Sequence, residues 1–154
     1  MMLPLEEGTP PKPRGSPAKI ADGNASKFSP DGGWLSFTAG DRPSNVFIQH
    51  LETGARFQVS TGGGSDPTWA ASARELFFRV GSRMMVVELS FNGPSVRIGR
   101  PQTLFEGDYF DSGYDVTPDG KRFVMVRIAD ANTRSLSVRL NWPAELERLA
   151  PTQR

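Results

Sequence analysis

A turn-and-strand motif recurs along the chain and constrains its fold more than any other feature. "FSPDGGWLSF" starts at Phe28 and "VTPDGKRFVM" at Val116, and "WAASARELFF", which starts at Trp69, matches both in pattern. The three starts are 41 and 47 residues apart. A period in the forties with strand-like content is the spacing of β-propeller blades.

The Pro-Asp-Gly part of the motif predicts a tight turn. Proline fixes φ at about −65°, aspartate accepts a hydrogen bond from backbone two residues on, and glycine tolerates positive φ. The second copy reads Ala71-Ser72-Ala73, which weakens the turn but leaves the strand intact. The residues predicted to form these turns, and not to bind a substrate, are Pro30, Asp31, Gly32, Pro118, Asp119 and Gly120.

The strands that follow the turns carry apolar residues on both sides, which suits sheets covered on both faces. The segments between turn signals predict antiparallel units of four strands each. The strands are expected at 25–28, 34–39, 45–51 and 55–60 in the first unit, and at 66–69, 75–80, 83–89 and 96–105, broken by Pro101, in the second. The third unit has strands at 114–116, 122–128 and 136–142 and lacks the fourth.

These units predict an all-β chain of about three and a half propeller blades. Three blades are expected within residues 22–142, at about 22–60, 61–105 and 106–142. Residues 1–21 are interpreted as a Pro-rich part of a preceding blade, with its last two strands at 2–5 and about 12–21. Residues 143–154 are expected to hold a short helix and a tail, because "PAELERLAP" places Pro at the first helical position.

The ordered repeat resembles the TolB-like propeller repeat, a relative of the Trp-Asp repeat. "GRPQTLFEGDYFDSGYDVTPDGKRFVMV" and "LNWPAELERLAP" further resemble the end of the propeller fused to many bacterial serine/threonine protein kinases. The resemblance implies a six-bladed ring, usually noncatalytic, that serves protein contacts or sensing. In those kinases the propeller would lie outside the cytoplasmic membrane, behind a transmembrane helix. The sequence contains neither the kinase motifs nor such a helix.

Three and a half blades would leave sheet edges unpaired, so ring closure is a physical problem. One interpretation is that the chain is the C-terminal part of a longer protein. The alternative is self-association, in which the strand near residues 12–21 of one chain completes the last blade of another. Two chains would then form one ring with two-fold symmetry.

Composition argues against several functions. The chain has no cysteine and a single histidine, His50, and no Gly-x-Ser-x-Gly elbow, so neither a hydrolytic triad nor a zinc site is supported. The net charge is +1 without a basic stripe, which speaks against nucleic-acid binding. No apolar run has the length of a signal peptide or membrane span. No enzyme activity, cofactor or membrane insertion is predicted, and the compartment stays open.

Three aspartates are the candidate binding residues. Asp66 and Asp115 are expected on inner strands at comparable places, near the mouth of a central channel, with Asp111 in the loop before Asp115. Glu106, Asp108, Asp111 and Asp115 could also supply oxygens to calcium, although the spacing is not that of an EF-hand. Exposure to channel water is the simpler explanation of these carboxylates. The predicted function is therefore a noncatalytic module for protein interaction or ligand sensing, with a kinase sensor domain or a peptidase accessory propeller as alternatives.

Overall fold

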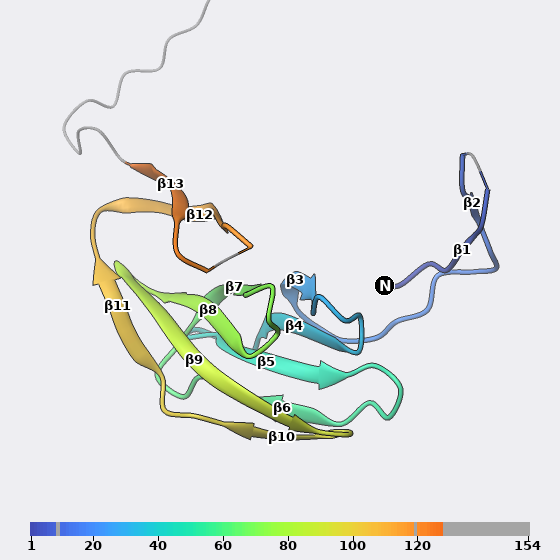
Figure 1. The fold of residues 1–154 in the computed structure, drawn as a ribbon, viewed down its shortest axis with the longest axis horizontal. Coiled ribbons are helices and arrows are strands. Elements are labelled where there is room, and N and C mark those ends of the chain that lie inside the picture. The colour runs from blue at the N-terminus through green and yellow to red at the C-terminus, as the bar shows by residue number, and fades with distance from the viewer. Residues whose placement is uncertain (9, 119, 128–154) are drawn as a thin grey trace, which may run out of the picture.

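The computed structural model describes residues 1–8, 10–118 and 120–127, and all regular structure in them is β-strand. All strand pairs are antiparallel, and the strands form three successive sheets and one short hairpin (Figure 1). The all-β expectation is confirmed for this part of the chain. Asp119, the predicted strand at 136–142 and the predicted helix at 143–151 lie outside the described residues.

The first sheet is a meander in the order β3-β4-β5-β6. Its strands are β3 (Asn24–Phe28), β4 (Trp34–Ala39), β5 (Asn45–His50) and β6 (Arg56–Gln58). Each predicted strand of this unit is present, and β4 coincides with its predicted limits. Turns with a left-handed glycine separate β3 from β4 and β5 from β6, at Gly32 and Gly54.

The second sheet repeats the meander with a divided outer strand. It contains β7 (Ser65–Trp69), β8 (Glu75–Val80) and β9 (Arg83–Asn92), followed by β10 (Ser95–Ile98) and β11 (Gln102–Glu106). Both β10 and β11 pair with the long strand β9, one along each half. The break predicted at Pro101 falls between them, because proline has no N–H to give to the strand ladder.

The third sheet is described as two strands, β12 (Tyr109–Val116) and β13 (Phe123–Arg127). β12 begins five residues before the predicted strand, because a register irregularity between Tyr109 and Tyr114 extends the pairing. Comparable irregularities interrupt the innermost strands of the other two sheets. Ala25, Asp66 and Gly113 lie within these irregularities with φ values of 49°, 51° and 83°, so the bulge recurs with the repeat.

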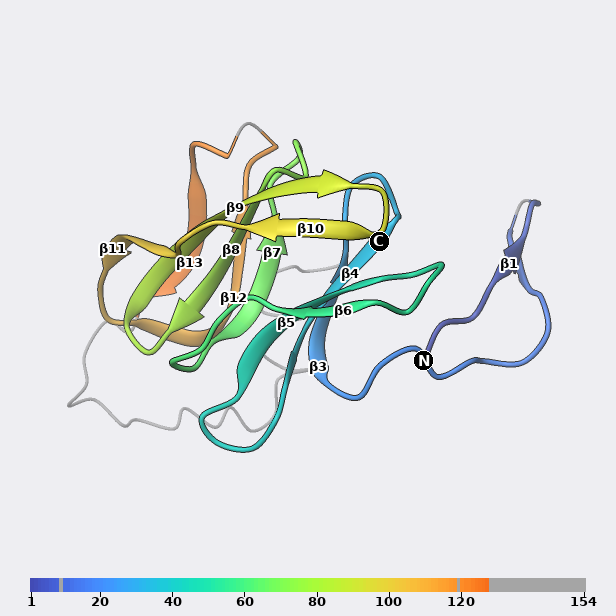
Figure 2. The same cartoon turned by 90° about the horizontal axis from the view of Figure 1, so that it is seen from below.

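The sheets pack face to face through two apolar clusters. Leu76 and Phe78 of β8 point to the first sheet, where they meet Trp34 and Ile48. Phe77, between them, packs with the third sheet. Figure 2 shows the first, second and third sheets one after another, in agreement with these contacts. Apolar residues on both sides of β8 are therefore buried, as the sequence pattern predicted.

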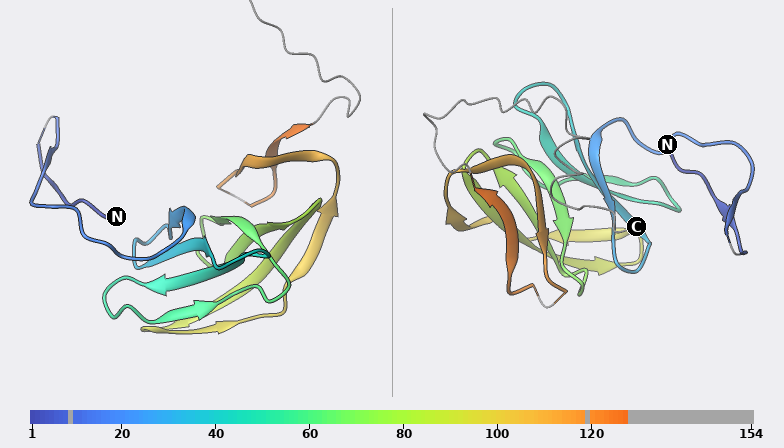
Figure 3. Two further views of the ribbon diagram at one scale, coloured as in Figure 1. Left: turned by 180° about the vertical axis from the view of Figure 1, so that it is seen from behind. Right: turned by 90° about the horizontal axis from the view of Figure 1, so that it is seen from above.

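The N-terminal segment differs from the predicted pair of blade strands. Only β1 (Leu5–Glu6) and β2 (Lys12–Pro13) form, joined as a hairpin, with one further bridge between Met2 and Ala18. The prolines at 4, 10, 11, 13 and 17 lack the N–H that a longer ladder needs. The hairpin is exposed and projects away from the sheets (Figure 3).

Candidate functional site

The innermost strands β3, β7 and β12 belong to successive sheets and are joined by hydrogen bonds between the sheets. The indole Nε1–H of Trp69 donates to the carbonyl oxygen of Lys27 at 3.1 Å, from β7 to β3. The hydroxyl of Tyr114 donates to the carbonyl oxygen of Asp66 at 2.7 Å, from β12 to β7. These two bonds fix the spacing of the strands that carry the candidate aspartates.

Asp66 lies at the bulge of β7 and is half-buried. Its φ of 51° is left-handed, a conformation that aspartate adopts more readily than most residues because its short side chain can bond locally. The bulge turns the Asp66 carbonyl toward the third sheet, where Tyr114 binds it. At this position the backbone therefore carries the contact between sheets.

Tyr114 lies between the two predicted site residues. Burial of its ring raises the pKa of the Tyr114 hydroxyl far above its usual range, and a hydrogen bond with Thr68 opposes that shift. The negative charges of Asp66 and Asp115 raise the Tyr114 pKa further. Tyr114 is therefore a group on which both predicted aspartates have an electrostatic effect.

Asp115 and Asp66 do not occupy comparable places in the repeat, which corrects the sequence interpretation. Asp115 pairs with Val124, whereas the corresponding pair in the second sheet is Thr68 with Phe77. Asp66 instead corresponds to Gly113, since both are left-handed residues of the bulge. The alternation of a strand then sends the Asp115 side chain away from Tyr114, to the face that carries Val124.

That face of the third sheet forms an open groove of about 460 Å³ beside Asp115, Thr117 and Arg122. Asp115 is exposed, and its Oδ1 accepts the amide of Val116 at 2.8 Å. Val124 and Val126 on the same strand face are 68% and 60% exposed. The groove therefore combines a carboxylate with uncovered apolar surface.

Glu106 and Asp111, two further acidic candidates, belong to β11 and β12. Asp111 lies on β12 within its irregular stretch, and the Glu106 carboxylate accepts the hydroxyl of Ser82 at 2.7 Å. In the described ranges, no three acidic or histidine side chains are close enough to hold a metal ion.

Arg79 is a residue of this region that the sequence interpretation missed. It is 3% exposed on β8, although the strand is otherwise apolar apart from Glu75 at its start. Its guanidinium donates to the carbonyl of Gly81 at 2.9 Å and to that of Tyr109 at 3.5 Å. A single arginine inside "LFFRV" was the available signal, because a buried charge requires partners.

The turn residues contact backbone. Asp31 Oδ1 accepts the hydroxyl of Ser29 at 2.5 Å and the amide of Gly33 at 3.1 Å. The bond from Ser29, and then the bond from Gly33, lower the pKa of the Asp31 carboxyl. In the second copy Ser72 takes the same part, since its hydroxyl accepts the amide of Arg74 at 3.2 Å. Asp31 thus stabilises a turn in the first sheet.

His50, Gly62 and Gly63 also have packing or connecting positions. The His50 ring meets Trp34 edge-on at 4.9 Å between centroids, and its Nδ1 bonds Thr53. Gly62 and Gly63 lie on the connector between β6 and β7, which links the first sheet to the second. Neither feature assembles a nucleophile with a base.

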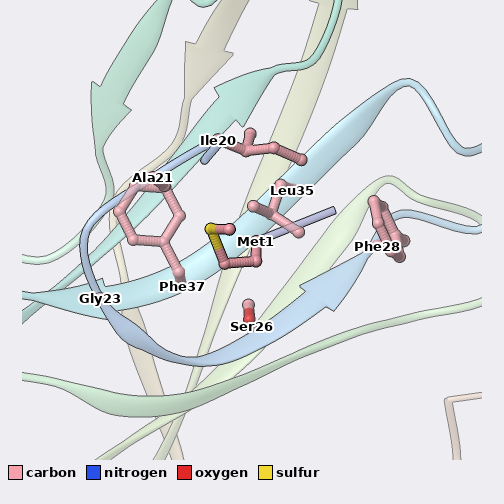
Figure 4. Close-up of a pocket in the computed structure, with 8 residues that line it drawn as sticks. All are labelled: Met1, Ile20, Ala21, Gly23, Ser26, Phe28, Leu35 and Phe37. Carbon is pink, nitrogen blue, oxygen red and sulfur yellow. The ribbon is translucent and has the colours of Figure 1, made fainter. Parts of the chain in front are cut away.

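A small cavity lies on the face of the first sheet that points away from the second sheet. It has a volume of about 110 Å³ and is lined by Phe28, Leu35 and Phe37 together with Ile20 and Met1 (Figure 4). Gln49 donates to the carbonyl of Ile20 at 3.2 Å, which holds the N-terminal segment on this face. The chain's own residues therefore cover Leu35 and Phe37, which are only 7% and 1% exposed.

Solved structures identify the fold. TolB from Acinetobacter baumannii is similar with a TM-score of 0.48 and 22% identity, over 70% of this chain and 27% of that one. A candidate TolB from Agrobacterium tumefaciens is similar with a TM-score of 0.50 and 17% identity, over 75% of this chain and 40% of that one. The fold is TolB-like.

The matched part spans well under half the length of either TolB chain. No family model matches the sequence, and no curated protein matches it. The comparisons therefore establish the architecture of β-propeller sheets and leave activity and partners to be proposed. None of the described segments forms a helix with the length and hydropathy needed to cross a membrane.

Proposed function

We propose that the chain is a noncatalytic propeller module that binds a partner protein at its innermost strands, with Asp66, Asp111 and Asp115 at the contact surface. The observation that carries the proposal is the groove beside Asp115, where a carboxylate adjoins the exposed Val124, and Val126 is exposed further along the same strand. Apolar surface rimmed by polar groups is typical of protein interaction sites. The polar contacts described above hold backbone or neighbouring sheets, which supports a binding role over a chemical one.

The proposal is tested by photo-crosslinking in cells that produce the full chain. A photoreactive residue at position 115 should capture one defined partner, and the same residue at Glu52 should not. Glu52 is exposed in the hairpin between β5 and β6, at the outer strands of the first sheet. Equal capture at both positions, or none at 115, would contradict a partner site at the innermost strands.

We propose further that these sheets belong to a six-bladed ring, with blades at about 22–60, 61–105 and 106–142. Face-to-face packing of the consecutive sheets supports their being neighbouring blades, and the count of six is the one that the family resemblance implies. Two alternative functions indicated by the sequence are the sensor propeller of a bacterial serine/threonine kinase and the accessory propeller of a peptidase. The genomic sequence upstream decides between them, because a continuous reading frame into a kinase or a peptidase domain identifies the parent protein.

Self-association is the other way to cover the exposed sheet faces. Phe28 on β3 is 54% exposed, and Val124 and Val126 lie uncovered on β13. In a pair of chains, the segment near residues 12–21 of one chain would supply the fourth strand of the last blade of the other. Light scattering of the purified chain tests this, and a well-folded monomer at micromolar concentration would exclude it.

A further inference from the structure

A second groove lies between the first and second sheets, away from the three aspartates. It has a volume of about 340 Å³ and opens between the connector from β6 to β7 and the break between β10 and β11. This volume is at the lower end of the range for ligand pockets, about 300–1,000 Å³. The groove can therefore accept one or two side chains of a bound segment.

One wall of the groove is apolar and fixed. Phe78 is 1% exposed in the cluster between the two sheets, and Val80 and Met85 pack against that cluster. All three line the groove. Since they come from paired strands β8 and β9, this wall is present before any ligand binds, which lowers the entropic cost of binding.

The opposite wall is the connector at residues 60–63, which is also held in place. Ser60 is 3% exposed, accepts the amide of Val46 at 2.9 Å and donates to Asn45 Oδ1 at 3.2 Å. The amide of Gly63 donates to the same oxygen at 3.1 Å. Asn45 thus anchors this wall to β5, while Thr61 and Gly62 remain exposed at the rim.

The rim carries two positive charges. Arg83 and Arg100 line the groove and are exposed. The ion pair found among the described residues joins Lys19 and Asp22, so neither arginine has a carboxylate partner there. The nearest acidic residue along the ladder is Glu106, opposite Arg83, and its carboxylate accepts the hydroxyl of Ser82 instead.

We propose that this groove binds a short acidic segment of a partner protein, with carboxylates on Arg83 and Arg100 and an apolar side chain against Phe78, Val80 and Met85. Guanidinium groups form strong, often bidentate hydrogen bonds with carboxylates. The apolar wall beneath them selects a segment that carries an apolar residue next to its acids. The inference rests on the proposed interaction function, because the occupant is a protein segment, but it uses a different surface.

The test is a peptide titration of the full chain followed by amide NMR. The probe is acetyl-Gly-Glu-Phe-Glu-Gly-amide, compared with a neutral analogue in which Gln replaces both Glu and with an analogue in which Ala replaces Phe. The probe should shift the amides of Thr61, Gly62 and Arg83 with saturation in the millimolar range, about 1 mM for a site of this size. The neutral peptide should bind at least about tenfold more weakly, because charge-assisted bonds are lost, and the Ala peptide several-fold more weakly.

Variants on the protein side complete the design. Replacing both rim arginines, Arg83→Gln with Arg100→Gln, should weaken the probe at least about tenfold, and Lys at both positions should restore part of the affinity. Arg97→Gln is the matched control, since Arg97 is exposed on β10 and does not line the groove. Equal binding of the charged and neutral peptides, or an unchanged affinity in the double variant, would overturn the proposal. Crosslinking at position 115 does not depend on these arginines, so the two proposals fail separately.

Discussion

Ala73 adopts the left-handed backbone conformation of Gly32, with φ of 56° against 73°. The two residues end equivalent turns, and their amides donate to Ala70 and Ser29 at the same distance, 2.9 Å. The second copy of the motif thus lacks Pro-Asp-Gly but still forms the same turn.

Ala73→Gly should stabilise the chain. A non-glycine residue costs about 1–2 kcal/mol in this conformation, and the greater freedom of glycine in the unfolded chain offsets about 0.4–1 kcal/mol of that, so we expect a gain of about 0.5–1 kcal/mol. The reverse change, Gly32→Ala, should cost a similar amount, because no atom would contact the added Cβ within 4 Å. Urea unfolding of both variants measures this, and a loss of stability in Ala73→Gly would show that the left-handed turn is not formed.

Gly64→Ala should destabilise the packing between the first and second sheets. An added Cβ would lie 2.8 Å from Ser60 Oγ and 3.2 Å from the ring of Phe78. Overpacking of this kind costs about 1–3 kcal/mol. Gly62→Ala is the control, since its Cβ would meet nothing within 4 Å. Thermal unfolding compares them, and equal melting temperatures would contradict the close packing at Gly64.

Tyr114→Phe should weaken the contact between the second and third sheets. The change removes the 2.7 Å hydrogen bond to the Asp66 carbonyl, which is worth about 1 kcal/mol and more if the acceptor stays buried without a partner. Tyr109→Phe serves as the control, because its hydroxyl forms no hydrogen bond within the described residues. Denaturant unfolding should separate the two variants. A Tyr109→Phe loss as large as that of Tyr114→Phe would show that the effect does not come from the hydrogen bond to Asp66.

Tyr114 also predicts a loss of stability at alkaline pH. Its pKa in the folded chain is raised by burial above the usual value of about 10 that applies to the unfolded chain. As the pH rises, the unfolded chain therefore loses the Tyr114 proton before the folded chain does. The contribution of Tyr114 to the free energy of unfolding is intact below pH 10 and falls by up to about 1.4 kcal/mol per pH unit above it. The free energy of unfolding is measured from pH 8 to 11 for the native chain and for Tyr114→Phe. Subtracting one from the other removes the contribution of the lysines, which both chains share. A difference that does not change with pH would contradict the raised pKa.

The strand pattern could be predicted because its signals are local. Apolar runs bounded by Gly and Pro located β4 and β8 at their observed limits, and the proline at 101 marked the divided outer strand. The bulge of the innermost strands could not be predicted, since its left-handed position holds three different residues, Ala25, Asp66 and Gly113, and alanine gives no signal of a positive φ. That missed bulge also explains why Asp66 and Asp115 were wrongly assigned to comparable places.

The contacts of the site depend on how one sheet meets the next, and a repeat motif does not contain that information. The bond from Tyr114 to Asp66 joins residues 48 positions apart. The burial of Arg79 beside Tyr109 depends likewise on the third sheet. The sequence interpretation named the aspartates but could not identify Tyr114, which binds the Asp66 carbonyl.

Both faces of the second sheet are covered along β8. Leu76 and Phe78 belong to the cluster shared with the first sheet, and Phe77 belongs to the cluster shared with the third. Among the described residues, one cluster joins the second sheet to the first and the other joins it to the third. Such a chain has no flexible linker between independent domains in its described part, because each sheet shares a packed interface with the next. Loss of the third sheet would expose Phe77 and Met84 and leave the interface between the first and second sheets intact. The free energy of unfolding of such a molecule is therefore a sum over interfaces between neighbouring sheets.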